Sequence, residues 1–437
     1  MKKFVRAGVA ALAACSLIFT AIDASAAGHA GASTTPPKLK TGITLSMWDY
    51  FGAGSSERAT EQKLIDQWAR ATHNHVTTPQ HPDNSNTKMC VSAPTGNAPD
   101  LIGVPHDQVS VMVQCGVVSP VPAWAWTTSQ QKTYIRAGLQ AVTLAGKIYG
   151  MPWAIETTGL FYNKALISSS AFKPAAGKKY LTWSKLVSEL QAKTDLSAGK
   201  PGLGWDIGNL YHDYAFMSGN GGYVFKYAKT GFNYRNIGLD NAGAIKGINF
   251  IKNLTTNGTY KLMPASMTET VALGLFTTGK LPVMLTGPWD EQNFQKANLN
   301  VGFAPDPSFD GIHPSHPFSG VQVYAINKYS QHPNEAASLL AYLTSHMQIP
   351  MFKSSGRIPV IKSLLTSKTV AKDPLATGLG KAALAAQPMP NISEMNQVWT
   401  PMGNALTLAI QNKASASDAA HAAVTQIKAD IAKAHGG

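Results

Sequence analysis

A single carboxylate, Glu156, lies in the middle of an otherwise mostly apolar stretch of this chain, residues 146–164. The stretch opens with a turn signal and contains two apolar segments with the pattern of β-strands, separated at Gly159. An extended segment of this kind can leave one folded unit and enter another, with the charge facing the gap. The functional interpretation of Glu156 is a residue that faces a polar pocket beside a hinge, although composition alone favours the alternative. The alternative is a solvated carboxylate on an ordinary loop.

A second carboxylate, Asp107, follows a predicted strand over residues 100–104 and begins a predicted helix over residues 107–115. Open α/β sheets bind ligands at the carboxyl ends of their strands. A carboxylate there can accept hydrogen bonds from two sugar hydroxyls, and charge-assisted hydrogen bonds are the stronger kind. Asp107 is therefore a candidate ligand-binding residue. The neighbouring His106, taken alone, is expected to be a structural histidine.

Aromatic side chains supply the other half of a sugar site, because their rings stack on the apolar faces of pyranose rings. Trp289 follows the buried strand predicted over residues 281–285 and lies in a Gly-Pro turn. A large ring held just past a strand end is poor core material, so Trp289 is predicted to be a stacking residue. Residues 206–214 form a predicted aromatic and polar loop that supplies Tyr211 and Asn209. The alternative for each is packing onto the core.

The elements that would position these residues alternate between strands and helices. Alternating apolar residues predict a first strand from residue 43, and helical spacing predicts a serine-capped helix over residues 56–71. Further helices are predicted over residues 181–192, 241–256, 268–279, 332–346 and 414–434, and a strand over residues 318–326. This order is typical of an α/β protein. A mature chain of about 410 residues exceeds what one core usually fills, so two lobes are expected.

The N-terminal segment has the features of an export signal. Basic residues precede a short apolar run over residues 9–22, and Ala24-Ser25-Ala26 forms a small-residue cleavage site. The run is too short for a membrane-spanning helix. We predict a signal peptide over residues 1–26 and a disordered leader over residues 27–41, in an exported protein that is soluble after cleavage. The alternative is a lipoprotein signal in which Cys15 is acylated and anchors the chain to the membrane.

The chain carries 37 basic and 24 acidic residues, a formal net charge of +13. Removal of the signal peptide leaves 34 basic and 23 acidic residues, or +11. The basic residues are scattered, which argues against binding to nucleic acid. Only 14% of the residues are charged, and the acids are the scarcer class. Paired carboxylates must take up protons as the medium becomes acid, so their scarcity favours an acidic exterior as the working environment.

Cysteine usage agrees with export, since only Cys90 and Cys115 remain after processing. An oxidising exterior favours a disulfide between them, and the alternative is two buried thiols. No cysteine or histidine spacing has the pattern of a metal site, so neither a metal nor another cofactor is expected. The chain also lacks a GxxxxGK[ST] loop and a spanning segment, which argues against an ATPase or a permease.

Several motifs resemble, in the same order, those of the maltose/maltodextrin-binding proteins of bacterial ABC importers. They are residues 98–107, 146–164, 221–226, 287–289, 356–359 and 389–399. The resemblance spans nearly the whole mature chain. It implies an α/β, two-lobed periplasmic-binding-protein fold with a ligand cleft and three inter-lobe crossings. It also implies that lobe I comprises residues 42–155 and 323–372, and that lobe II comprises residues 156–322 and 373–437.

The resemblance further implies a non-catalytic function: binding of an extracellular oligosaccharide and its delivery, by lobe closure, to an ABC permease and its ATPase. The protein is expected to act as a monomer. The binding residues implied by the matching positions are Asp107, Glu156, Tyr211, Trp289 and Trp399, to which we add Asn209, Asp49 and Met389. Two acids and three rings favour a neutral oligosaccharide, with maltose or maltodextrin first. Trehalose or another oligosaccharide remains open.

Departures from the family pattern limit the prediction of the sugar. Val104 and Gln108 stand where the relatives carry a tryptophan and an arginine around the matching aspartate, and Asn209 replaces an acid. Thr400 and Gly403 replace a tyrosine and an arginine. A different class of function also remains open. Asp107 and Glu156 could be the carboxylate pair of a secreted glycoside hydrolase, although the resemblance to a binding scaffold favours a protein that is not an enzyme.

Overall fold

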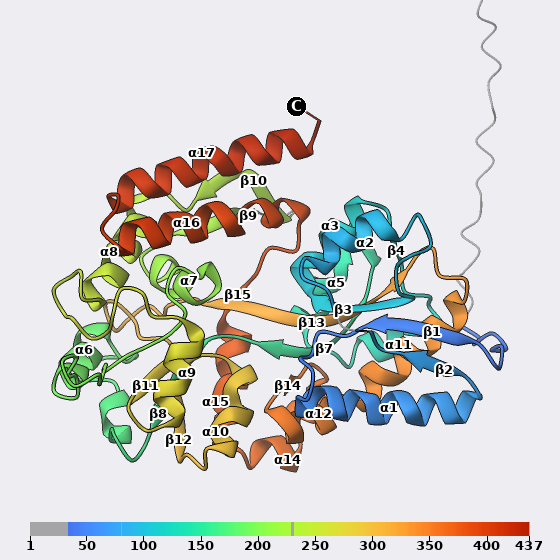
Figure 1. Cartoon of the computed structure of the whole chain (residues 1–437), viewed down its shortest axis with the longest axis horizontal. Helices are drawn as coiled ribbons and strands as arrows, with labels where there is room; N and C mark the ends of the chain where they lie inside the picture. The colour runs from blue at the N-terminus through green and yellow to red at the C-terminus, as the bar shows by residue number, and fades with distance from the viewer. Residues whose placement is uncertain (1–33, 80, 229–230, 437) are drawn as a thin grey trace, which may run out of the picture.

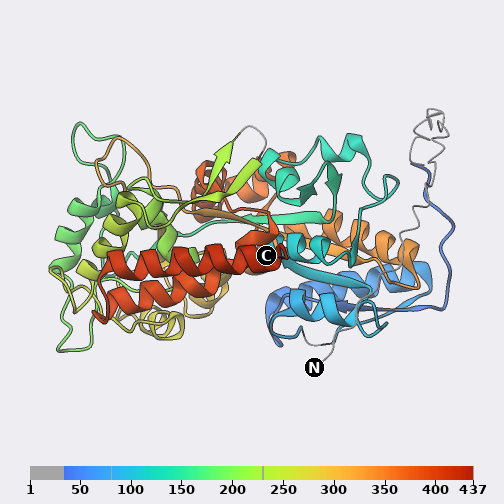
Figure 2. The ribbon, with the colours of Figure 1, turned by 90° about the horizontal axis from the view of Figure 1, so that it is seen from above.

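The computed structural model describes residues 34–79, 81–228 and 231–436. The predicted signal peptide, the alternative lipid anchor at Cys15 and residues 27–33 of the predicted leader lie outside the described residues. Figure 1 shows an elongated molecule built as two lobes, each around its own β-sheet. Figure 2, turned by 90°, shows the same lobes toward opposite ends of the long axis. The expectation of a two-lobed α/β protein is therefore confirmed.

Lobe I is built on a mixed sheet that has eight strands within the described residues. Its main path runs β14-β7-β13-β3-β1-β2, and β4 and β15 also pair with β13. The central strand is β13, whose ten residues are all buried. Two of its polar side chains donate hydrogen bonds: Gln322 to Glu156 at 2.8 Å and Asn327 to the carbonyl of Pro99 at 2.9 Å. The strands are β1 (Thr44–Trp48), β2 (His75–Thr77), β3 (Leu101–Pro105), β4 (Val118–Ser119), β7 (Met151–Glu156), β13 (Phe318–Asn327), β14 (Ile358–Pro359) and β15 (Gln387–Pro388).

The helices of lobe I pack on both faces of this sheet (Figure 1). Helix α1 begins as predicted after a serine cap, since the Ser55 hydroxyl accepts a hydrogen bond from the backbone N–H of Arg58 at 3.1 Å. A short hairpin, β5 (Thr143–Leu144) and β6 (Lys147–Ile148), precedes β7. The helices are α1 (Ser56–Thr72), α2 (Ser85–Ser92), α3 (His106–Gln114), α4 (Thr128–Gln131), α5 (Arg136–Val142), α11 (Pro333–His346), α12 (Gln348–Ser355), α13 (Lys362–Leu365) and α14 (Lys368–Ala371).

Lobe II is built on a smaller antiparallel sheet in which β8 lies between β11 and β12. A separate hairpin, β9–β10, projects from it. The strands are β8 (Gly159–Asn163), β9 (Tyr223–Ala228), β10 (Gly231–Gly238), β11 (Val283–Thr286) and β12 (Val301–Ala304). The helices are η1 (Ser169–Phe172), α6 (Trp183–Gln191), α7 (Leu210–Ser218), α8 (Ala242–Leu254), α9 (Glu269–Thr277), η2 (Pro288–Asp290) and α10 (Glu291–Lys296).

The chain passes between the two sheets at the places that the sequence indicated. Strand β7 pairs in the large sheet and β8 in the small one, so the first crossing is at Thr157 and Thr158. The second lies between β12 and β13. The third is drawn out: α15 (Pro374–Ala385) packs on both sheets, and β15 returns to β13 before η3 (Ser393–Gln397) leads to lobe II. The lobe boundaries stay a prediction, although β7 keeps Glu156 in the large sheet, one residue past the predicted boundary at 155/156. Pairing of β13 with β15 likewise starts at Phe318, before the predicted boundary at 322/323.

The C-terminal helices α16 (Trp399–Ile410) and α17 (Ala416–Ala434) lie side by side on α8 of lobe II (Figure 1). A disulfide joins Cys90 at the end of α2 to Cys115 at the end of α3, with Cα atoms 5.7 Å apart. The predicted cysteine pair is therefore confirmed. No helix in the described ranges combines the length and apolar character needed to span a bilayer.

Candidate ligand-binding cleft

A cleft of about 620 Å³ lies between the two lobes. Its lining comes from the carboxyl ends of lobe I strands, from the crossing segments and from the helix starts of lobe II. Seven of the eight predicted binding residues line it: Asp107, Glu156, Asn209, Tyr211, Trp289, Met389 and Trp399. The structure thus brings together side chains that lie far apart in the sequence. Their individual geometry decides what each can contribute.

Glu156 ends β7 and is fixed by two donors. Gln322 Nε2 donates to its Oε1 at 2.8 Å, and Arg357 Nη1 donates to its Oε2. Arg357 is only 5% exposed and also donates through Nε to Glu57 Oε1 at 2.6 Å. Burial alone would lower the pKa of this guanidinium, but the two carboxylates outweigh it and raise the pKa. Glu156 therefore faces the cleft as one member of a compensated Glu–Arg–Glu group.

Asp107 lies in the first turn of α3 and is joined to the far side of the cleft by an indole. Trp399 Nε1 donates to Asp107 Oδ2 at 3.2 Å. Burial raises the pKa of Asp107, while the neighbouring His106 and the Trp399 hydrogen bond act in the opposite direction. This bond links lobe I to the first residue of α16. A ligand in the cleft would meet a carboxylate and a ring that already hold each other.

His106 has the structural role that was expected of it. The backbone N–H of Val321 donates to its Nδ1 at 3.2 Å, so its Nε2 carries the proton and donates to the carbonyl of Met389 at 3.1 Å. Burial lowers the pKa of His106, which favours this neutral form. The histidine ties α3 to β13 and to the segment around Met389. Met389 reaches the cleft through this link.

A chain of rings runs from the lobe II side of the cleft through Phe318 of β13 to Trp399. The rings of Tyr211 and Trp289 meet edge to face, with their centroids 6.0 Å apart. The ring centroids of Tyr211 and Phe318 are 5.9 Å apart. The ring centroids of Phe318 and Trp399 are 6.2 Å apart, which completes the chain. Trp289 Nε1 donates to Glu269 Oε1 at 3.0 Å. Burial raises the pKa of Glu269, and the nearby Asp290 raises it further.

The predicted loop over residues 206–214 is only partly a loop, because α7 begins at Leu210. Asn209 caps this helix: its Oδ1 accepts from the backbone N–H of Tyr211 at 3.0 Å, and its Nδ2 donates to Asp206 Oδ2 at 2.9 Å. Its amide is therefore largely engaged in the protein. The aromatic composition that suggested a loop reflects a helix start whose first turn presents Tyr211 to the cleft.

A buried carboxyl group stabilises the segment that precedes α7. Asp213 is 0% exposed and accepts hydrogen bonds from Trp205 Nε1 at 2.7 Å and from the backbone N–H of Gly208 at 2.9 Å. Burial raises the pKa of Asp213 to about 7. These two bonds fix the segment that carries Asn209 and Tyr211.

Asp49 is the one predicted binding residue that the structure does not bring to the cleft. It is fully buried, forms an ion pair with Arg58 and accepts a hydrogen bond from the backbone N–H of Phe51 at 3.0 Å. Its side chain points into the core at the end of β1 because an internal cation is available there. The next residue, Tyr50, lines the cleft instead.

Sequence reasoning missed several residues of the cleft, among them Tyr50, Glu269 and Arg357. Arg357 lies in a motif that resembles the relatives, which was a usable signal. Glu269 looked like an ordinary acid in the first turn of a helix, and nothing in the sequence connected it to Trp289. Within the described ranges, no group of three or more histidine, cysteine or acidic side chains is arranged to hold a metal ion.

Comparison with known proteins gives consistent results. The sequence model of a family described as "Bacterial extracellular solute-binding protein" matches residues 63–378. A galactooligosaccharide-binding protein of Bacillus subtilis is 30% identical over 353 residues, which cover 79% of this chain and 80% of that protein. A maltodextrin-binding protein of the same organism is 29% identical, over 78% of this chain and 79% of its own length.

Solved structures agree in fold. The Thermus thermophilus maltotriose-binding protein bound with maltotriose has a TM-score of 0.79 and 31% identity, and the match covers 89% of this chain and 100% of that one. The maltose–maltodextrin-binding protein of the thermoacidophilic bacterium Alicyclobacillus acidocaldarius has a TM-score of 0.78 and 29% identity, over 88% of this chain and 100% of that one. The two-lobed fold predicted from the sequence is therefore that of known binding proteins.

Proposed function

Because the chain belongs to the family of bacterial extracellular solute-binding proteins, we propose that it binds a neutral oligosaccharide and delivers it to an ABC importer. The observation that carries the proposal is the cleft itself. The carboxylates Asp107 and Glu156 lie on its lobe I side, and the rings of Tyr211, Trp289 and Trp399 lie on the other sides, together with the carboxyl group of Glu269. Rings cover the apolar faces of a pyranose while carboxylates accept its hydroxyl protons, so this pairing of walls suits a sugar.

A bound sugar would contact both lobes and so join the two walls of the cleft. A sugar stacked on Trp289 and Trp399 would donate hydroxyl protons to Asp107 and Glu156, and movement of the lobes toward each other would exclude water from those bonds. A ligand shifts the equilibrium toward the closed form only by its differential affinity for that form. Contacts to both lobes supply this difference. The permease and its ATPase would then recognise the closed form and release the sugar inward.

Maltose or maltodextrin is the first choice of sugar, supported by the maltotriose- and maltodextrin-binding relatives. The galactooligosaccharide-binding relative keeps a second class open, and trehalose remains a further alternative. Calorimetry with maltose, maltotriose, trehalose, cellobiose and a galacto-oligosaccharide tests the proposal. We expect binding of at least one α-glucan. If none of the sugars gives heat or changes tryptophan fluorescence, the sugar-binding proposal is wrong.

The relatives are binding proteins and not enzymes, and the geometry of Glu156 supports the same function here. Its two oxygens accept hydrogen bonds from Gln322 and Arg357, and this fixed acceptor suits the binding of sugar hydroxyls. Incubation with maltotriose separates the two functions. We expect unchanged maltotriose with a changed tryptophan signal. Release of glucose would favour the glycoside hydrolase.

For the location, we propose export followed by cleavage, which leaves a soluble monomer at the outer face of the membrane. An anchor at Cys15 is the alternative, and a Streptococcus pneumoniae relative named as a lipoprotein gives it some support. Mass spectrometry of the mature N-terminus decides between them. A chain that begins near residue 27 supports cleavage after Ala26, whereas a chain that begins at an acylated Cys15 supports the anchor.

A further inference from the structure

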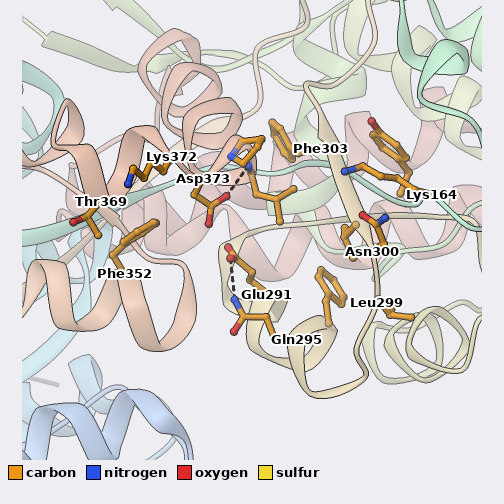
Figure 3. Close-up of a pocket in the computed structure, with 16 residues that line it drawn as sticks. Lys164, Glu291, Gln295, Leu299, Asn300, Phe303, Phe352, Thr369, Lys372 and Asp373 are labelled. Carbon is orange, nitrogen blue, oxygen red and sulfur yellow. Dashed lines mark hydrogen bonds between the residues drawn. The ribbon is translucent and has the colours of Figure 1, made fainter.

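A second cavity, of about 600 Å³, lies outside the sugar cleft, where η2 and α10 of lobe II meet α12 of lobe I and the start of α15 (Figure 3). At its inner side lies Glu291, the first residue of α10, which is 2% exposed. Gln295 Nε2 donates to Glu291 Oε1 at 3.2 Å. The other oxygen, Oε2, has no hydrogen-bond partner among the described residues. A buried carboxyl oxygen without a donor is costly when it is charged.

Glu291 Oε2 lies against the backbone of lobe I. A Cβ atom placed on Gly356 would be 1.9 Å from it, so the contact needs a glycine there. Gly356 also has φ 72°, a left-handed conformation that favours glycine, and it caps the C-terminal end of α12. The carboxyl group thus lies at the negative end of α12, which disfavours a carboxylate, and in the first turn of the short helix α10, which favours one.

The charged groups around Glu291 do not compensate an ionised form. Asp373, the cap of α15, faces it across the cavity, and Asp290 precedes it in the chain (Figure 3). Two lysines also line the cavity: Lys164, which follows β8, and Lys372, which precedes α15. Lys353 of α12 is exposed. No ion pair joins any of these lysines to Glu291 in the described part of the chain.

This contact adjoins the sugar cleft through both of its partners. Trp289 lies two residues before Glu291, and Arg357 follows Gly356 directly. Trp289 belongs to the ring wall of lobe II, whereas Arg357 holds Glu156 in lobe I. A movement of η2 and α10 away from α12 would therefore move Trp289 relative to Arg357.

We propose that Glu291 is a proton-operated contact between the lobes: the neutral acid packs on Gly356 and keeps the cleft walls together, whereas the carboxylate leaves this position and lets the lobes separate. Burial, followed by repulsion from Asp373, raises the pKa of Glu291 to about 7, which agrees with this role. The neutral form dominates below that pH. The inference rests on the proposed function for its ligand readout, and affinity for sugar is then higher in acid than in alkali.

Calorimetry with the sugar that binds best, from about pH 5 to about pH 9, tests the affinity of the wild type and of Glu291→Gln. Glutamine has the shape of the neutral acid and cannot ionise. We expect wild-type affinity to fall about tenfold across this range, and affinity of the variant to change far less. Equal pH slopes in the two proteins would overturn the proposal. Glu189→Gln is the matched control, because it makes the same substitution at an exposed residue of α6 that lies outside this contact. Its affinity profile should follow that of the wild type.

A second measurement does not need a sugar. Small-angle scattering of the ligand-free wild type should show a larger radius of gyration above about pH 7 than below it, and Glu291→Gln should stay compact. Asp373→Asn keeps the cap of α15 but removes the facing charge, so the midpoint should move to lower pH. An unchanged radius in the wild type, or an unmoved midpoint in Asp373→Asn, would overturn the proposal. Absence of sugar binding with these scattering changes intact would overturn the proposed function alone.

Discussion

The two walls of the cleft use carboxyl groups in opposite ways. On the lobe I wall, Glu156 and Glu57 share the buried cation Arg357. On the lobe II wall, Glu269 and Asp213 support Trp289 and the start of α7, and no ion pair involves either of them in the described residues. Burial raises the pKa of Asp213 to about 7 and shifts that of Glu269 in the same direction.

This difference shows how a neighbouring cation affects a buried carboxyl group. A buried carboxylate beside a guanidinium has its charge compensated, while burial raises the pKa of a carboxyl group that has no cation beside it. Lobe I therefore presents Glu156 to the cleft beside a cation, whereas Asp107 on the same wall has no cation and burial raises its pKa. Lobe II presents rings whose positions depend on weakly acidic groups. The two walls should respond differently to mutation and to pH.

The largest effect is expected from removal of the shared cation. Arg357→Gln leaves Glu156 and Glu57 buried without their partner, and breaking a buried ion pair costs about 3–5 kcal/mol in unfolding free energy. Urea denaturation measures this loss. Arg136→Gln is the control, since Arg136 is exposed and lies outside this group. A loss no larger than that of the control would mean that lobe I does not depend on the compensated group.

On the lobe II wall, a comparable effect should appear with pH. An aspartate has a pKa of about 3.9 in the unfolded chain, and the pKa of Asp213 is raised to about 7 in the folded protein. The native state then binds the extra proton, so stability falls as pH rises from about 4 to about 7, by up to ~4 kcal/mol for this group. Urea denaturation at several pH values should show a smaller fall in Asp213→Asn.

The same measurement tests the expectation of an acidic working environment. Glu291 and Asp306, whose pKa values burial also raises to about 7, add to the fall in the same direction. The wild type should therefore be more stable in mild acid than at neutral pH. A stability optimum near neutral pH, with loss of structure in mild acid, would contradict both the expectation and the account of lobe II.

Lobe I alone carries the disulfide, which gives the next effect. The Cys90–Cys115 bond has a sequence separation of 25 residues, and a loop of this length is stabilised by about 3 kcal/mol in the chain-entropy model. We expect the double substitution Cys90→Ser, Cys115→Ser to lower the unfolding free energy by about this amount. Sugar affinity should not change, because Asp107 lies at the opposite end of α3 from Cys115. Calorimetry on the double variant checks this, and a large loss of affinity would show that α3 itself moves.

The ring wall is tested by Trp289→Ala. Loss of a stacking aromatic ring should weaken sugar binding by about 1–3 kcal/mol, measured by calorimetry. Trp289→Phe is the matched control, because it keeps a ring but removes the donor to Glu269, and its loss should be smaller. Unchanged binding in the alanine variant would remove Trp289 from the site.

Much of this arrangement could be predicted from local sequence patterns. Apolar alternation and helix caps located β1, α1, α6 and α8 to within a few residues. Asp107 and Trp289 were found because each follows an apolar strand, and Glu156 was found because the apolar stretch around it resembles that of the maltose/maltodextrin-binding proteins. These signals are local, and the structure places all three at the cleft.

The rest depends on contacts between segments that no local pattern connects. Asp49 also follows a strand, but Arg58, nine residues later, draws it into the core. Glu269 supports Trp289 from 20 residues away, and Arg357 reaches Glu156 across 201 residues. Asn209 looked like a ligand group because its role as a helix cap is visible only once α7 begins at Leu210. The hydrogen bonds and ion pairs that these four residues form, and not their residue types, decided their roles.

The smallest effect is expected at Glu269, one of the two carboxyl groups that accept a hydrogen bond from a tryptophan of the cleft; the other is Asp107. In Glu269→Gln the amide oxygen can still accept the Trp289 indole proton, and only the charge assistance is lost, so sugar affinity should fall by about 1 kcal/mol or less. Asp107→Asn should cost more, because Asp107 holds Trp399 and also faces the ligand directly. Calorimetry on both variants ranks them. Equal losses would mean that Glu269 also touches the sugar, and the lobe II wall would then contribute a carboxylate as well as rings.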